Sequence, residues 1–175
     1  TIVNFFSNAH YEEVLAETER FLQSSPSSAT ALHLKAQAHY QLGEYEECVA
    51  LLERTIVYVA GSEPLDTRLQ LAALLANALL EQGHYDEAWD LVTHAVPAES
   101  SSREEYGELL LASAWSAHFQ GLSGLAREST QRVFAISGND FTCGRAALCA
   151  ALAAQRVGAN HRAKAYLMKA QHHLE

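Results

Sequence analysis

The side chains best suited to chemistry are nine histidines, three cysteines and several pairs of adjacent acidic residues. A metal site needs ligands that converge, but His33 and His39 are six residues apart, which is about 240° around a helix. His172 and His173 are adjacent and point apart for the same reason. We therefore expect no metal site and interpret the histidines as surface or groove residues.

Catalytic motifs are also missing. Residues 121–124 (Gly-Leu-Ser-Gly) lack the Gly-x-Ser-x-Gly spacing and the strand–turn–helix setting of a nucleophilic serine. The glycines stand where helices are expected to turn, so none belongs to a phosphate-binding loop. Acidic pairs such as Glu46 and Glu47 lie near expected helix starts, where the helix dipole favours negative charge. The sequence predicts a protein that is not an enzyme and uses no cofactor.

The cysteines indicate packing. Cys48, Cys143 and Cys149 are odd in number, contain no Cys-x-x-Cys pair and lie on helical faces where alanine would also fit. Such cysteines are typical of small buried side chains in a reducing compartment. We expect a cytoplasmic protein without disulfides.

Charge and hydropathy exclude two further classes of partner. The most apolar stretch, residues 69–80, is too short to span a bilayer and is interrupted by Gln70 and Asn77. Residues 1–110 carry a net charge of −13 and residues 111–175 a net charge of +4. The first part would repel nucleic acid, and the second is too sparse in basic residues to bind it. The split itself fits either an ordinary solvated surface or a dipolar surface that orients a partner.

A repeat determines the expected architecture. Residues 42–48 (Leu-Gly-Glu-Tyr-Glu-Glu-Cys) return forty positions later as residues 82–88 (Gln-Gly-His-Tyr-Asp-Glu-Ala). A period of 34–40 residues is typical of stacked two-helix units that bury their apolar faces against one another. We expect five helix hairpins, with repeat units at residues 1–28, 29–63, 64–99, 100–138 and 139–175.

Each hairpin repeats the same internal pattern. A glycine follows the first helix, a small residue lies seven positions before it, and another small residue lies five positions after it. Only glycine adopts the left-handed conformation of such a turn cheaply, and small residues let two helices cross closely. The glycines are Gly43, Gly83, Gly121 and Gly158; the small residues are Ala36, Ala76, Ala114 and Ala151, then Cys48, Ala88, Ala126 and Ala163.

These residues resemble the tetratricopeptide repeat (TPR), whose unit is a helix–turn–helix with small crossing residues, a glycine–aromatic turn and a trailing proline. The stretch from Tyr11 to Pro26 matches its second half, and the later units are longer, like those in sensor domains of bacterial transcription activators. The resemblance covers nearly the whole chain and implies an all-α, right-handed superhelix. Measured back from Tyr11, the first helix of the family would begin before Thr1, so we expect residues 1–175 to form one repeat domain of a longer protein.

The resemblance also implies a concave groove lined by the first helix of each hairpin. Residues spaced by three and four positions on those helices share one face. The predicted groove residues are Tyr40, Asn77, Leu111, Trp115, His118, Phe119, Arg145, Leu148, Leu152 and Arg156. The same stripe also fits packing into the core or cover by a neighbouring domain.

An apolar patch flanked by arginines suits an amphipathic helix or a short peptide that carries carboxylates. The sequence therefore predicts a module that binds a protein partner in its groove, without nucleic acid or membrane. The alternative is a ligand- or partner-sensing domain of a multidomain bacterial transcription regulator. The partner and the oligomeric state are not specified by the sequence.

Overall fold

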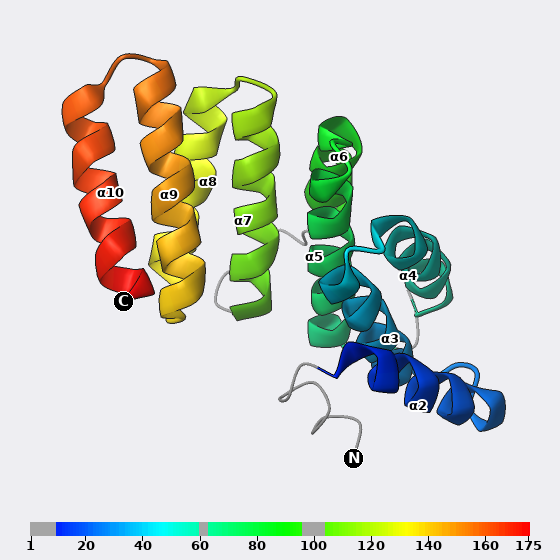
Figure 1. Ribbon diagram of the computed structural model, residues 1–175. Helices are drawn as coiled ribbons and strands as arrows, with labels where there is room; N and C mark the ends of the chain where they lie inside the picture. The colour runs from blue at the N-terminus through cyan, green and yellow to red at the C-terminus, as the bar shows by residue number, and fades with distance from the viewer. Residues whose placement is uncertain (1–9, 60–62, 96–103) are drawn as a thin grey trace. The chain divides into compact units, whose positions relative to one another are not determined.

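The computed structural model describes residues 10–59, 63–95 and 104–175, and within these ranges all regular structure is helical (Figure 1). Residues 1–9 of the first predicted repeat unit, residues 60–62, and residues 96–103 at the junction of the third and fourth predicted units lie outside the described residues. The helices are α2 (Tyr11–Ser24), α3 (Ala29–Leu42), α4 (Tyr45–Val59), α5 (Leu65–Glu81), α6 (Tyr85–Ala95), α7 (Glu104–Phe119), α8 (Ser123–Ile136), α9 (Asp140–Arg156) and α10 (Asn160–Leu174).

The chain divides into two compact units, Thr1–Gln82 and Gly83–Glu175, and the boundary falls in the turn between α5 and α6. In each unit successive helices pack against each other. The first helices of neighbouring hairpins also touch, α3 against α5 in the first unit and α7 against α9 in the second. This combination of contacts is that of stacked helix hairpins, and the predicted all-α fold class is confirmed.

The turns between paired helices have the predicted glycine geometry. Gly43, Gly83, Gly121 and Gly158 all have positive φ, between 73° and 82°. At the end of α3 the Gly43 N–H donates to the Tyr40 carbonyl, and the Glu44 N–H donates to the His39 carbonyl, at 3.1 and 2.9 Å. This pair of bonds is a Schellman motif, which satisfies carbonyl groups that the helix end would otherwise leave free.

We expect Gly43→Val to lower the free energy of unfolding by about 1 kcal/mol or more, because a β-branched residue is strained at positive φ. A Cβ atom added at Gly43 would meet no atom within 4 Å, so backbone strain is the only source of the loss. Urea unfolding measures it. Gly43→Asn is the control, since asparagine tolerates the left-handed region; equal losses for Val and Asn would show that strain is not the cause.

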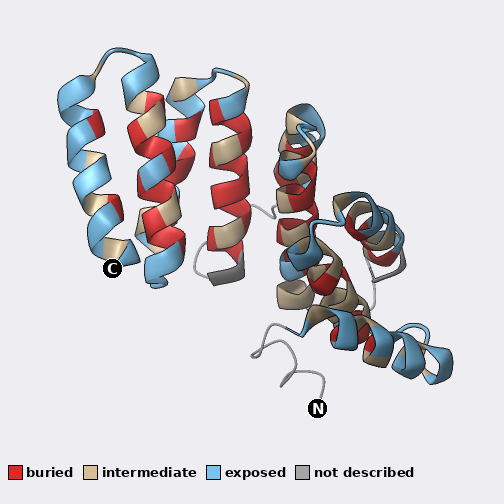
Figure 2. Cartoon of the chain, in the orientation of Figure 1, coloured by how far each residue is buried: buried red, intermediate tan, exposed pale blue. Residues whose placement is uncertain are grey.

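The predicted crossing residues are buried. Ala36, Ala76 and Ala114 on the first helices have no exposed surface, and neither do Cys48, Ala88 and Ala126 on the second helices. Figure 2 shows these inward-facing stripes in red, with exposed residues on the outer sides of the helices. Because each crossing position is filled by a small side chain, the helix backbones pack closely without leaving a cavity.

The helix starts follow local capping rules. The Ser28 Oγ accepts a hydrogen bond from the Ala31 N–H at 3.3 Å, and the Asn139 Oδ1 accepts one from the Thr142 N–H at 3.0 Å. Each bond satisfies one of the free N–H groups at a helix N-terminus. Ser28 and Asn139 are therefore the N-caps of α3 and α9.

Candidate partner-binding face

Helix α7 is buried on nearly all sides. Between Tyr106 and Phe119 only three residues are partly or largely exposed, namely Glu108, Trp115 and Phe119. They lie 7 and 4 residues apart, which puts them on one stripe of the helix. Phe119 is 44% exposed, a high value for a large aromatic side chain. The stripe is therefore the one part of α7, over these residues, that can meet a partner.

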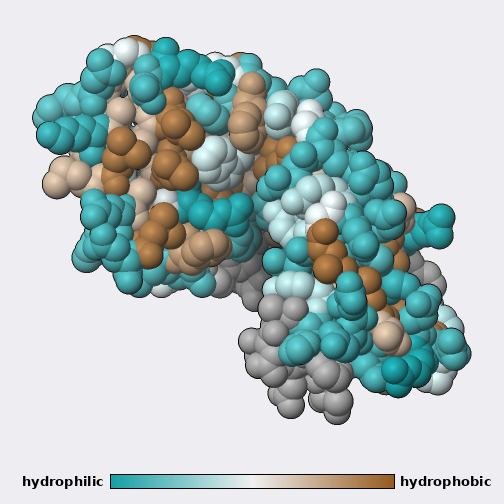
Figure 3. Space-filling view, viewed as in Figure 1, coloured by the Kyte–Doolittle hydropathy of each residue, from teal (hydrophilic) through white to brown (hydrophobic). Residues whose placement is uncertain are grey.

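Helix α9 carries a parallel stripe, made of Phe141, Arg145, Leu148, Leu152 and Arg156. Phe141 is 62% exposed and Leu148 36% exposed, and Leu152 is half-buried. On the face drawn over α9, hydrophobic side chains in brown alternate with hydrophilic ones in teal (Figure 3). We call the two stripes together the α7–α9 face; it comprises Glu108, Trp115, Phe119, Phe141, Arg145, Leu148, Leu152 and Arg156.

An ion pair sets the register between the two helices. The Arg145 guanidinium lies 3.6 Å from the Glu108 carboxylate, and the Thr142 hydroxyl donates a hydrogen bond to the same carboxylate. Arg145 follows Glu108 by 37 positions. The same offset of 37 positions relates Trp115 to Leu152 and Phe119 to Arg156.

Aromatic rings form a continuous run at one end of this face. Phe119 stacks on Tyr85 of α6 with ring centroids 4.7 Å apart, and on Trp115 at 5.8 Å. Trp115 also packs against the buried cluster around Tyr106 and Leu111. The run is therefore anchored in the core at Trp115 and open to solvent at Phe119.

The positive charge of the face is concentrated at the aromatic end. Arg145 is balanced by Glu108, whereas Arg156 is exposed and forms no ion pair with any described residue. A Cβ atom added at Gly121 would lie 3.2 Å from the Arg156 Nη1, so the guanidinium reaches the turn that follows Phe119. An unbalanced cation beside exposed aromatic rings favours a ligand with a carboxylate next to an apolar side chain.

Two predicted groove residues belong to the core instead. Leu111 has no exposed surface and His118 is 7% exposed, so neither offers a surface to a partner. Leu111 lies among Tyr106, Leu110 and Val133, whose bulk covers it. The spacing of three and four residues gave the correct side of α7 for Trp115 and Phe119. It could not show that neighbouring helices close over the edges of the stripe.

His118 is a buried ring in a positive environment. Its Nδ1 makes no hydrogen bond within the described part of the chain, and the ring packs edge-on against Trp115 at 5.9 Å. Burial lowers the pKa of His118 below 6.5, and the charge of Arg156 lowers it further. Burial also lowers the pKa of His33 on α3.

We expect both of these histidines to titrate below pH 6.5 in ring NMR spectra. As pH falls below 6.5, these histidines take up protons more readily in the unfolded chain than in the folded chain. The free energy of unfolding is therefore highest above pH 6.5 and declines as the pH falls below it. Arg156→Gln should raise the midpoint of His118, because a positive charge is removed, and should leave His33 unchanged. A His118 midpoint at or above 6.5 would contradict the assignment.

The first unit holds the remaining predicted groove residues. The Tyr40 hydroxyl donates to the Glu81 carboxylate at 3.4 Å, which links α3 to α5, and the Tyr40 ring packs edge-on against Tyr45 at 5.4 Å. Asn77 is half-buried one turn before Glu81. Tyr40 thus helps to fix its own hairpin and its neighbour, and Asn77 lies beside that contact on α5.

The three cysteines pack in the interior. Burial raises the pKa of the Cys48 and Cys149 thiols to about 12, which keeps them protonated and unreactive. All three cysteines are buried, and none of them forms a disulfide. Across residues 10–59, 63–95 and 104–175 no three His, Cys, Asp or Glu side chains are grouped to hold a metal ion, and no helix is long and apolar enough to cross a membrane.

Two members of the face, Glu108 and Phe141, were not predicted as site residues. Phe141 is the second residue of α9, and the Arg145 guanidinium carbon lies 5.7 Å from its ring centroid. Its spacing of four from Arg145 was a usable signal. Tyr85, beside the face, stacks on Phe119, 34 residues away, and this contact could not be read from local sequence.

The chain matches a known family of repeat proteins. A family model described as anaphase-promoting complex, cyclosome, subunit 3, which is of the TPR type, matches residues 7–95, just over half of the chain. The chain belongs to this TPR family. No curated protein sequence matches it.

Solved structures of TPR-like proteins superpose on nearly the whole chain. A candidate kinesin light chain from Podosopora anserina, with nearly identical TPR-like repeats, has 19% identity and a TM-score of 0.74, covering 99% of this chain and 91% of its own. MamA residues 41 to the end from Desulfovibrio magneticus RS-1 have 12% identity and a TM-score of 0.75, covering 98% and 89%. At such identity the likeness shows the fold alone. TPR-like repeats typically act as non-catalytic scaffolds, and this fold supports a protein–protein interaction module in general.

Proposed function

We propose that the chain binds a segment of a partner protein on the α7–α9 face, and that the segment is an amphipathic helix or short peptide carrying carboxylates. The observation that carries the proposal is the aromatic stripe of the partly exposed Trp115 and the exposed Phe119 on a helix that is otherwise buried. A large aromatic ring left 44% exposed and stacked on Trp115 is the type of surface that binding partners cover.

The chemistry of the face supports this ligand. Its centre is apolar, made by Trp115, Leu148 and Leu152, and suits the apolar side of a helix with anchors three and four residues apart. Arg156 at one end is unbalanced and would attract a carboxylate. Arg145 is already held by Glu108, so it positions the seam and contributes less net charge.

The test uses peptides selected for binding to the purified chain from a displayed library of random 15-residue peptides. We expect selected peptides to combine apolar residues at helical spacing with an acidic residue. Phe119→Ala and Leu148→Ala should each weaken the selected peptides by about tenfold or more in fluorescence anisotropy, as expected for residues at the centre of an interface. Trp115 is a poorer choice for substitution, because it also packs against the core.

Leu125→Ala is the matched control. Leu125 on α8 is 41% exposed, similar to Leu148, and lies outside the α7–α9 face. It should leave affinity unchanged. Arg156→Gln should reduce the association rate, and the reduction should be smaller at high salt. If the selected peptides bind equally to wild type, Phe119→Ala and Leu148→Ala, the proposed face is not the binding site.

A further inference from the structure

A hollow lies between α8 and α10, on the side of α9 opposite to the α7–α9 face. Its volume is about 240 Å³, and it is lined by Ser123, Gly124, Arg127, Ala150, Ala153, Ala154, Val157, Ala159, Arg162 and Tyr166. At about 100° per residue, Ala150 stands roughly 200° around α9 from Leu148. The hollow is therefore separate from the α7–α9 face.

The floor of the hollow is apolar and long enough for a few residues. Ala150, Ala153, Ala154 and Val157 are spaced by three and four positions, so they share one side of α9. From Ala150 to Val157 the helix rises about 10 Å, which equals about three residues of extended chain. Because each floor residue is small, the floor is recessed between the side chains of the flanking helices.

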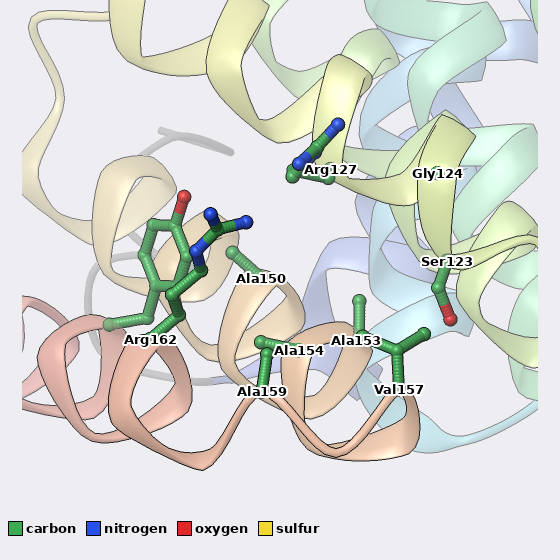
Figure 4. Close-up of a pocket in the computed structure, with 10 residues that line it drawn as sticks. Ser123, Gly124, Arg127, Ala150, Ala153, Ala154, Val157, Ala159 and Arg162 are labelled. Atoms are coloured by element: carbon green, nitrogen blue, oxygen red, sulfur yellow. The ribbon is translucent and has the colours of Figure 1, made fainter.

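Two arginines stand over one end of this floor. Arg127 comes from α8 and Arg162 from α10, and their side chains extend toward the same end of the hollow, with Ala150 between them (Figure 4). Ser123 and Val157 lie toward the other end. Both arginines are exposed, and neither forms an ion pair or side-chain hydrogen bond with a described residue. No acidic residue lines the hollow, so the lining residues provide no counter-charge for these two guanidinium groups.

We propose that this hollow is a second docking site, which takes an extended segment of a partner protein with an acidic side chain followed by small apolar residues. The carboxylate pairs with Arg127 and Arg162, since guanidinium groups bind carboxylates through two parallel hydrogen bonds. The following side chains cover the alanine floor. The volume is below the roughly 300–1,000 Å³ typical of small-molecule sites, which favours a few side chains over a whole cofactor.

The balance of charge agrees with an acidic ligand. Residues 111–175, which contain all of α8, α9 and α10, hold seven basic and three acidic residues. Of these acidic residues Asp140 pairs with His173 and Glu175 bonds to Gln171, and the third, Glu128, is exposed on α8 and does not line the hollow. A carboxylate in the hollow would supply the missing counter-charge.

The test measures binding of the full chain to fluorescein-labelled six-residue peptides. The acidic probe has the core Glu-Ala-Leu, and its counterparts carry Gln or phosphoserine in place of Glu. We expect saturable binding of the acidic probe, with about tenfold weaker binding of the Gln peptide. Arg127→Gln and Arg162→Gln should each weaken the acidic probe by about fivefold or more.

Controls separate this site from general attraction and from the α7–α9 face. Lys164→Gln removes one charge from α10 outside the hollow, and both it and Phe119→Ala should leave the affinity within about twofold of wild type. Equal losses for Lys164→Gln and Arg162→Gln would overturn the proposal. So would the absence of saturable binding, or tighter binding of the phosphoserine peptide through the same arginines, which would assign a phosphate ligand instead.

Discussion

Leu111→Ala should lower the free energy of unfolding by about 2–5 kcal/mol, the range for removing a fully buried leucine side chain. Leu111 has no exposed surface and lies among Tyr106, Leu110, Val133 and Ala146. The lost methyl groups contribute transfer free energy, and the cavity left behind costs more because three helices fix its walls. Urea or thermal unfolding of the full chain measures the loss.

Leu148→Ala is the control for that prediction. Leu148 follows Leu111 by 37 positions and has the same place in the repeat, but it is 36% exposed. We expect its substitution to change stability by well under 1 kcal/mol while weakening peptide binding. If Leu148→Ala destabilises the chain as much as Leu111→Ala, Leu148 is a core residue and the α7–α9 face loses its apolar centre.

Ala126→Leu should lower the free energy of unfolding by about 1–3 kcal/mol through overpacking. Ala126 on α8 has no exposed surface and packs with Ala117 of α7 and Ala153 of α9, with Trp89 against the same cluster. Three added carbon atoms would push apart helices that cross through small side chains. The same reasoning applies to Ala88, which is equally buried.

The control for Ala126→Leu is Ala135→Leu, the same change at an exposed position of the same helix. It should alter stability by no more than about 0.5 kcal/mol, because leucine is nearly as good a helix former as alanine. Denaturant unfolding with an unchanged m-value would confirm that both variants unfold from the same fold. If Ala126→Leu has the same free energy of unfolding as wild type, the assigned crossing of α7, α8 and α9 is wrong.

The two proposed surfaces would let one unit hold two segments at once. The α7–α9 face and the hollow between α8 and α10 lie on opposite sides of α9 and use different charges, Arg156 in one case and Arg127 with Arg162 in the other. Variants of either surface can therefore be tested without disturbing the other. Loss of one binding activity with the other intact would also exclude unfolding as the cause.

The sequence by itself determined the hairpins. Gly43, Gly83, Gly121 and Gly158 were predicted to have positive φ, and all four do. Each of these glycines follows the first helix of a hairpin as predicted, between α3 and α4, α5 and α6, α7 and α8, and α9 and α10. These features are local, because a turn glycine, a capping serine or a small crossing residue acts through neighbours a few positions away.

Tertiary structure alone decided which side chains of the groove stripes reach solvent. Leu111 and Leu148 are equivalent in the repeat, but Val133 of α8 and Ala146 of α9 belong to the buried cluster around the first, whereas the second is 36% exposed. The hollow beneath Arg127 and Arg162 likewise arises where three helices meet. Exposure depends on the size of side chains brought from other helices, and a spacing rule within one helix contains no information about them.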